Sequence, residues 1–235
     1  MHHIPFKINI RTSVQVAELI VHLTKPTWRF MNSEIREIWN SRYNTGTYIY
    51  GTRPNDFLRR SVKMIPPGEI LCLGEGEGRN AVYLARKGYP VTAVDISDIG
   101  LAKVKRLAQE SNVKIETVWS DLFDYQITPG KWSGIISIFC HVPADLRIDL
   151  HRRVTKGLAP GGIFILESYT PEQLKFKTGG PPTQDLLVTL KDLEKELSGL
   201  TILHGVERER IVSEGNLHTG MAAVVQIIAK KPATK

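Results

Sequence analysis

One stretch of the chain constrains its fold more than any other, because a predicted strand, a glycine loop and a predicted helix follow one another without a break. The strand is expected over residues 69–73, and glycine then occupies every second position at Gly74, Gly76 and Gly78. Glycine tolerates left-handed backbone conformations and lets a ligand approach where a Cβ would collide. The helix expected over residues 78–87 offers unpaired N–H groups to an anion in its first turn.

A carboxylate completes this pattern at the end of the next predicted strand, residues 91–95. Asp95 follows Gly76 by nineteen residues, where a carboxylate can bind both hydroxyls of a ribose. A tight turn and a helix-capping acid would explain the glycines and the acid separately. The order and spacing of strand, loop, helix, strand and acid along the chain instead favour a ligand-binding site.

The loop does not match the dinucleotide fingerprint G-x-G-x-x-G. Counted from Gly74, the position of the third glycine holds Arg79. Counted from Gly76, the pattern ends in Ala81, but it then begins two residues too far past the end of the strand. The loop also contains Glu75 and Glu77, which would be poor neighbours for a pyrophosphate. Two acids favour a ligand that carries positive charge, such as a sulfonium or an ammonium.

Strands and helices alternate along the rest of the chain until its end, which is typical of βαβ units and a parallel sheet. The last two predicted strands have no helix between them, so they form an antiparallel hairpin with a polar tip over residues 213–220. The expected class is α/β, with a doubly wound, mostly parallel sheet of seven strands. The remaining expected strands are residues 114–119, 133–140, 163–167, 201–212 and 221–229, and the helices among them are 97–110, 143–158 and 190–197. Two short helices are expected before the first strand, one ending near Tyr43 and one from Asn55 to Met64.

The first thirty residues differ from the rest in being poor in acids. We interpret residues 1–30 as an N-terminal extension, either disordered or a targeting segment for an organelle. Met31 precedes Asn32, Ser33 and Glu34, a sequence typical of a helix start, so the main domain is expected over residues 31–232. Without such targeting the protein is expected in the cytoplasm. The longest apolar runs fall far short of the roughly 20 residues of a membrane-spanning helix.

Charge and cysteine content argue against other classes of protein. The formal net charge of +7 is scattered, and no dense basic run interleaved with aromatic residues is present, so nucleic acid is not expected as a partner. Cys72 and Cys140 are too few for a disulfide scaffold or a cysteine-rich zinc site. Both lie in apolar runs, which predicts buried, reduced thiols of an intracellular protein, and no metal site is expected.

Residues 71–78 resemble the first motif of the class I S-adenosylmethionine-dependent methyltransferases, and the similarity extends from about Trp39 to Lys231. Within that superfamily the chain most resembles the small-molecule branch that includes tellurite- and thiopurine-type methyltransferases. This closer likeness is carried by residues 39–43, 50–55 and 78–80. The resemblance implies a Rossmann-like methyltransferase fold and S-adenosyl-L-methionine as cofactor.

The same resemblance implies roles for individual residues. The glycine loop should hold the methionine part of the cofactor, Asp95 the ribose and Asp121 the adenine amino group. Many relatives have an acid where this chain has Cys72. We expect Glu75 to take the place of that missing acid at the methionine ammonium. The full set of expected cofactor-binding residues is Trp39, Arg42, Tyr43, Gly74, Glu75, Gly76, Gly78, Asn80, Asp95, Ile96, Asp121, Leu122 and Cys140.

The resemblance also implies that the end of the fourth strand, residues 139–141, lines the methyl-transfer side. His141 is the candidate catalytic base, with a packing role as the alternative, and Tyr50, His141 and His218 are the candidate substrate-binding residues. His218 could equally be part of a polar hairpin tip. An aromatic lid is suggested by Trp39, Tyr43, Tyr48 and Tyr50, and residues 176–182 form either a substrate wall or a linker. His151, between arginines of a predicted helix, is expected on the surface, and His204 has no evident partner.

These observations favour an enzyme that methylates a small soluble acceptor by in-line displacement at the sulfonium methyl group, acting as a monomer or weak homodimer. Such a transfer depends mainly on alignment and the exclusion of water, so a catalytic base is optional. A methyltransferase that acts on RNA or protein and a non-catalytic S-adenosylmethionine-binding module remain as alternatives.

Overall fold

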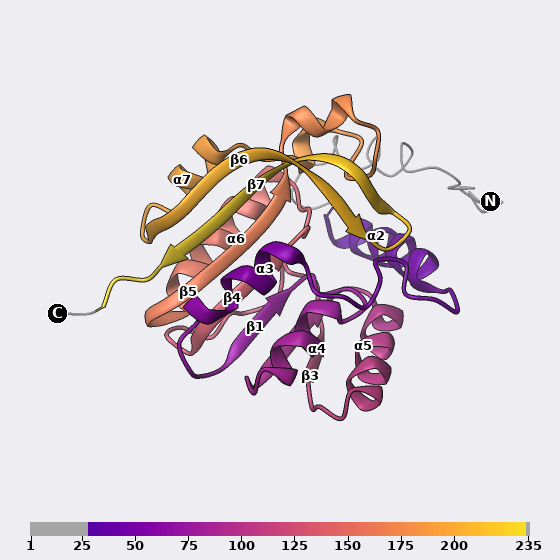
Figure 1. The fold of residues 1–235 in the computed structure, drawn as a ribbon, viewed down its shortest axis with the longest axis horizontal. Coiled ribbons are helices and arrows are strands. Elements are labelled where there is room, and N and C mark those ends of the chain that lie inside the picture. The colour runs from indigo at the N-terminus through magenta and orange to yellow at the C-terminus, as the bar shows by residue number, and fades with distance from the viewer. Residues whose placement is uncertain (1–27, 234–235) are drawn as a thin grey trace, which may run out of the picture.

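The computed structural model describes residues 28–233, which form one seven-stranded sheet covered by helices on both faces (Figure 1). The strand order is β3-β2-β1-β4-β5-β7-β6. The first five strands run parallel, and β7 runs antiparallel to both of its neighbours. The predicted fold class is therefore confirmed. The strands are β1 (Ile70–Leu73), β2 (Val91–Asp95), β3 (Glu116–Trp119), β4 (Trp132–Ile138), β5 (Leu158–Tyr169), β6 (Thr201–Glu214) and β7 (His218–Lys230).

The helices connect these strands and also precede the first of them. They are α2 (Trp28–Tyr43), α3 (Asp56–Ser61), α4 (Arg79–Arg86), α5 (Asp98–Glu110), α6 (Ala144–Gly157) and α7 (Leu190–Glu196), with short 3₁₀ turns at Val62–Met64, Pro171–Lys175 and Gln184–Leu186. Ser97 caps α5 as predicted, because its hydroxyl accepts a hydrogen bond from the Gly100 amide.

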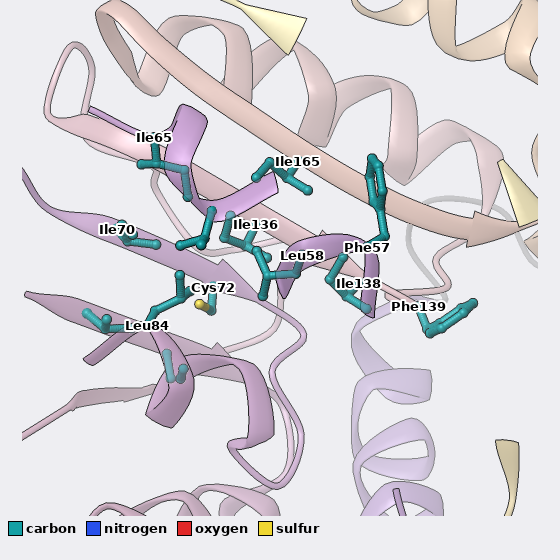
Figure 2. Close-up of a cluster of buried hydrophobic side chains, with 14 of the residues drawn as sticks. Phe57, Leu58, Ile65, Ile70, Cys72, Leu84, Ile136, Ile138, Phe139 and Ile165 are labelled. Atoms are coloured by element: carbon teal, nitrogen blue, oxygen red, sulfur yellow. The ribbon is translucent and has the colours of Figure 1, made fainter. Parts of the chain in front are cut away.

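Alternating side chains of the buried strands pack into two separate hydrophobic cores, one on each face of the sheet. Cys72 of β1 and Ile136 of β4 pack with Leu58 of α3 and Leu84 of α4 on one face, as Figure 2 shows. Leu71 and its neighbours on the other face pack against α6 and α7. Because successive strand residues point to opposite faces, continuous apolar runs such as residues 70–73 supply both cores.

Two predicted boundaries are wrong. Asn32 and Ser33 lie within α2, which already includes Trp28, so they do not start the helix. The fifth strand, expected over residues 163–167, begins at Leu158 opposite Trp132. The proline and glycines at 160–162 therefore lie inside β5, and a register shift between Trp132 and Gly134 accommodates them.

The hairpin is also longer than predicted, and its turn is shorter. β6 continues to Glu214 and β7 begins at His218, so three residues form the turn. The Asn216 amide donates a hydrogen bond of 2.8 Å to the Ile49 carbonyl, which anchors the turn beside the chain that follows α2 (Figure 1). This contact brings the end of the hairpin to the carboxyl edge of the parallel strands.

No helix within residues 28–233 has the length and apolar character needed to cross a membrane. The predicted N-terminal extension lies outside the described residues, apart from its last three positions, which belong to α2.

Candidate functional site

A cavity of about 810 Å³ opens at the carboxyl edge of the parallel strands, and its volume lies within the range typical of small-molecule sites. In a doubly wound sheet this edge is where ligands bind. The cavity brings together residues predicted from separate parts of the chain: Trp39, Arg42, Tyr43, Tyr50, Gly74, Glu75, Gly76, Asn80, Asp95, Ile96, Asp121, Leu122, Cys140, His141 and His218.

Gly78 is the predicted site residue that is absent from this lining. Its φ of +100° is left-handed, and a Cβ there would lie 2.9 Å from the Cα of Val104 in α5. Gly76 is similar, since a Cβ would lie 2.6 Å from the Tyr43 hydroxyl oxygen. The glycines are therefore required by backbone conformation and by close protein neighbours, and not by a ligand alone.

Glu75 occupies the helix N-terminus that the sequence suggested for an anion. Its Oε1 accepts hydrogen bonds from the amides of Asn80 (3.1 Å) and Ala81 (2.8 Å) at the start of α4. Burial raises the pKa of this carboxyl group to about 7, and these amides oppose the shift. The Glu75 carboxylate also lies against the Cys72 thiol. Glu75 thus supplies a carboxylate beside Cys72, the position at which the resemblance implies an acid in many relatives.

Glu77, the second loop acid, is neutralised within the protein. Its Oε1 accepts a hydrogen bond of 2.7 Å from Lys103 Nζ, and its Oε2 accepts one of 3.1 Å from the Tyr50 amide. Both side chains of the Glu77–Lys103 pair are buried. The interpretation of Glu77 as a free partner for a cationic ligand is therefore wrong.

Asp95 links the end of β2 to the glycine loop. Its Oδ2 accepts from the Gly76 amide at 2.7 Å and its Oδ1 from the Ser97 amide at 2.8 Å. Burial raises the pKa of this carboxyl group to about 6, against the effect of these amides. Each carboxylate oxygen has a second lone pair, so Asp95 can also accept hydrogen bonds from ribose hydroxyls.

Asp121 and Leu122 line the cavity beyond β3, beside Phe123. Asp121 Oδ1 accepts from the Phe123 amide at 2.7 Å, and burial raises the pKa of the Asp121 carboxyl group. Ile96 lines the wall between Asp95 and this corner. A polar edge beside exposed apolar surface of Phe123 suits the amino group and the ring of adenine.

Aromatic side chains from α2 cover the glycine loop. The rings of Trp39 and Tyr43 stack with their centroids 5.5 Å apart, and Tyr50 meets Tyr43 edge-on at 6.3 Å. The Arg42 guanidinium lies 4.8 Å from the Trp39 ring and donates to the Tyr50 hydroxyl at 3.3 Å. Tyr48 does not join this group, because its hydroxyl bonds to the Lys103 carbonyl in α5.

His141 and His218 also line the cavity, and both rings lie beside those of Phe139 and Tyr169. The His218 ring lies 4.6 Å from the Tyr50 ring and 4.9 Å from that of Phe139. Burial and then the positive charge of Arg79 lower the pKa of His218 to about 2, and burial lowers that of His141 to about 4. Both imidazoles are therefore neutral near pH 7. The alternative placement of His218 in a polar hairpin tip is wrong, since it is 7% exposed.

The other two histidines within residues 28–233 lie away from the cavity. His151 is buried, and its Nδ1 lies 2.7 Å from Glu196 of α7, so the predicted surface position is wrong. The ring of His204 lies 5.6 Å from that of Phe57. Neither residue lines the cavity.

The segment after β5 forms a wall, because residues 179–182 and Leu186 line the cavity. Sequence reasoning missed Arg79 as a site residue, whereas the strand end at residues 139–141 lines the cavity as expected. Phe139 directly follows β4 and has a φ of +51°, a backbone conformation that residues other than glycine rarely adopt and that often marks functional sites. The partner of Arg79 is Glu214, far along the chain, so no local pattern could reveal it.

Both cysteines are free thiols, as predicted. Cys140 packs against Gly74, where an added Cβ would lie 2.5 Å from its sulfur. Cys72 lies in the core shown in Figure 2. Burial raises the pKa of both thiols, so they are protonated near pH 7.

Comparison with known proteins gives a consistent result. Residues 70–162 match the family model described as a methyltransferase domain. A probable S-adenosyl-L-methionine-dependent methyltransferase, TehB of Haemophilus influenzae, is 33% identical over 86 residues, covering 37% of this chain and 28% of that protein. A 2-heptyl-1-hydroxyquinolin-4(1H)-one methyltransferase of Mycobacteroides abscessus is 27% identical over 104 residues, covering 42% and 45%. The chain thus aligns with less than half of the length of either relative.

The fold agrees over more of the chain. The crystal structure of Haemophilus influenzae TehB superposes with a TM-score of 0.63 and 19% identity, covering 83% of this chain and 66% of that one. At this identity the likeness establishes a shared fold and says nothing of the acceptor.

Proposed function

Because this chain belongs to the class I S-adenosylmethionine-dependent methyltransferases, we propose that it transfers a methyl group from S-adenosylmethionine to a small soluble acceptor. The main support for this proposal is that the residues proposed for the donor side and for the acceptor side line the same cavity. The quinolone methyltransferase among the relatives acts, by its name, on a small molecule.

The residues of the cavity fit the proposed cofactor, which is the methyl donor of this family. Asp95 accepts from the ribose hydroxyls, and Asp121 and Leu122 hold the adenine. Gly74, Gly76 and the covering rings of Trp39 and Tyr43 enclose the methionine part, with Arg42 at its edge. The sulfonium supplies a good leaving group, so the protein's task is to orient the acceptor and exclude water.

Within this proposal, His141 orients the acceptor and is not a strong base. A conjugate-acid pKa of about 4 makes its imidazole a weak proton acceptor at neutral pH. Tyr50, His218 and residues 179–182 form the other walls of the acceptor region. The concave, walled shape favours a small molecule over RNA or a folded protein as acceptor.

Methyl transfer from labelled S-adenosylmethionine to thiols, selenite, tellurite and small amines tests the proposal. We expect turnover with at least one small acceptor and binding of both the cofactor and S-adenosylhomocysteine. Binding without turnover on any acceptor would instead support a non-catalytic module. Transfer to RNA or protein alone would support the other alternative.

We also propose that the domain of residues 31–232 acts as a monomer or weak homodimer in the cytoplasm. Two unbridged thiols are consistent with a reducing compartment. Light scattering of the purified protein over a concentration series tests the oligomeric state. A stable assembly at low micromolar concentration would contradict it.

A further inference from the structure

Two imidazole rings in the cavity wall each carry a buried nitrogen to which the described residues make no hydrogen bond. His141 and His218 both line the cavity, and His218 is 7% exposed. Within residues 28–233, neither His141 Nε2 nor His218 Nδ1 has a hydrogen-bond partner, although both atoms are buried. Buried polar atoms are nearly always hydrogen-bonded, so two such atoms in one cavity wall indicate a ligand that supplies the partners.

The strand order places these histidines apart from the acids predicted to hold the ribose and adenine of the cofactor. Asp95 ends β2 and Asp121 follows β3, both on one side of β1 in the sheet. His141 follows β4 and His218 begins β7, both on the other side of β1. The glycine loop follows β1 and therefore lies between the two groups. With the methionine part of the cofactor at that loop, the histidines lie on the side of the acceptor.

Aromatic rings surround the two histidines. The centroid of the His218 ring lies 4.6 Å from that of Tyr50 and 4.9 Å from that of Phe139, and both of these neighbours line the cavity. Tyr169 packs against both imidazoles and is 1% exposed. A wall of rings that carries few polar atoms suits a planar aromatic ligand.

The charges beside these rings are balanced within the protein. Arg79 is the charged group that acts most strongly on the His218 imidazole. Its guanidinium pairs with Glu214 at 2.6 Å, and Arg210 pairs with Glu167 at 2.7 Å, with all four side chains largely buried. Two positive and two negative charges therefore cancel. An ionic acceptor would bury a charge without a counter-charge, which is costly.

Arg42 adds a positive charge, but the proposed function gives it to the cofactor. Its guanidinium lies 4.8 Å from the Trp39 ring, which covers the methionine part, and donates to the Tyr50 hydroxyl at 3.3 Å. The methionine part carries a carboxylate, which supplies the counter-charge. The acceptor is left with two imidazoles that burial holds neutral near pH 7, by lowering their pKa values. A neutral imidazole offers one N–H and one lone pair, and a hydroxyl group both donates and accepts, so a hydroxyl suits either nitrogen.

We propose that the methyl acceptor is an uncharged aromatic compound with a hydroxyl group, and that His141 and His218 bind this group through their unpartnered nitrogens. This inference rests on the proposed function, since it names the substrate class of the same cavity. Tyr50 and Phe139 contact the ring of the acceptor, and the histidines fix its orientation.

Calorimetric titration at neutral pH of the protein saturated with S-adenosylhomocysteine tests the inference. The probe is 2-naphthol, which is compared with naphthalene, 2-naphthoate and decahydro-2-naphthol. Naphthalene lacks the hydroxyl group, 2-naphthoate has a charged group in its place, and decahydro-2-naphthol lacks the aromatic rings. We expect 2-naphthol to bind about tenfold more tightly than naphthalene or 2-naphthoate, because one loses the hydrogen bonds and the other buries a charge. Decahydro-2-naphthol should bind about fivefold more weakly than 2-naphthol, because its saturated rings lose the aromatic contacts.

Variants of the two histidines test the role of their nitrogens. His141→Phe and His218→Phe keep a ring and remove both nitrogens, so each should weaken 2-naphthol binding about tenfold and leave naphthalene binding unchanged. His218→Asn keeps a hydrogen-bonding group and should retain more affinity for 2-naphthol than His218→Phe. His204 does not line the cavity, so His204→Phe is the matched control and should bind all four probes like the wild type.

The outcomes separate the two proposals. Equal binding of 2-naphthol and naphthalene would overturn the inference, as would tighter binding of 2-naphthoate or unchanged 2-naphthol binding by both folded phenylalanine variants. The comparison of probes uses the wild-type protein, so it decides even where a variant fails to fold. A wild-type protein that binds S-adenosylhomocysteine and none of the four probes would overturn the inference and leave the proposed function standing. A wild-type protein that does not bind S-adenosylhomocysteine would overturn the proposed function, and the inference with it.

Discussion

At the scale of single residues, one substitution tests the ribose-binding role proposed for Asp95. Its carboxylate accepts hydrogen bonds from the amides of Gly76 and Ser97, and the proposal adds the hydroxyls of a ribose. Asp95→Asn keeps one carbonyl oxygen and loses the charge. We expect it to weaken S-adenosylmethionine binding by about 1–3 kcal/mol, because charge-assisted hydrogen bonds to the ribose are lost. Calorimetry measures this effect.

The exposed Asp124→Asn is the matched control for that experiment and should leave affinity unchanged. A folded Asp95→Asn protein with wild-type affinity would mean that Asp95 only joins the loop to β2.

The buried carboxyl groups of Glu75 and Asp95 also predict how cofactor affinity depends on pH. Burial raises their pKa values to about 7 and about 6, so the folded protein binds more protons than the unfolded chain in this range. Their contribution to stability is therefore present at low pH and is lost as pH rises through these values. A positively charged ligand favours the ionised carboxylates, so S-adenosylmethionine affinity should rise from pH 5.5 to pH 8.

S-adenosylhomocysteine is the matched control for this prediction, because it lacks the sulfonium charge and is otherwise nearly identical. We expect its affinity, measured by calorimetry over the same pH range, to rise less steeply. Parallel pH profiles for the two ligands would argue that neither carboxyl group responds to the sulfonium.

At the scale of elements, Glu196 joins α7 to α6. Its carboxylate pairs with Arg147 at 2.9 Å and His151 at 2.7 Å, and all three side chains are largely buried. Removing one member leaves a buried charge without its partner. Glu196→Ala should lower the free energy of unfolding by about 3–5 kcal/mol, as measured by urea denaturation. Glu194→Ala, on the exposed side of the same helix, should change it by less than about 0.5 kcal/mol.

The elements differ in how far the sequence predicts them. The unit from β1 through α4 to β2 follows from local patterns, because apolar runs, glycines and Asp95 each act on near neighbours along the chain. The bounds of β5 and of the hairpin do not, because a register shift opposite Trp132 and the contact of Asn216 with Ile49 depend on distant segments.

The same distinction applies to the site. Residues at strand ends reach the cavity as predicted, because parallel strands place their carboxyl ends at one edge. The pairs Arg79–Glu214 and His151–Glu196 join residues far apart in the chain. A single sequence shows each member only as a charged or polar residue of a helix or strand, so neither pairing could be predicted.

At the scale of the whole molecule, ligand binding should stabilise the fold. S-adenosylhomocysteine at 100 times its Kd should add about 2.7 kcal/mol to the free energy of unfolding. For a chain of this size that corresponds to a rise in Tm of about 5–10 °C, which differential scanning fluorimetry measures. NAD at the same concentration should leave Tm unchanged, since the loop lacks the dinucleotide pattern. An equal or larger shift with NAD would contradict the assignment of the cavity.

The cavity's two halves have different origins along the chain. Under the proposed assignment, the donor half comes largely from one continuous run, residues 70–122, whereas the acceptor half is assembled from Tyr50, His141, residues 179–182 and His218. During synthesis the donor half therefore leaves the ribosome well before His218. A change of acceptor preference would therefore need substitutions in these separate segments and could leave the glycine loop of residues 74–78 as it is.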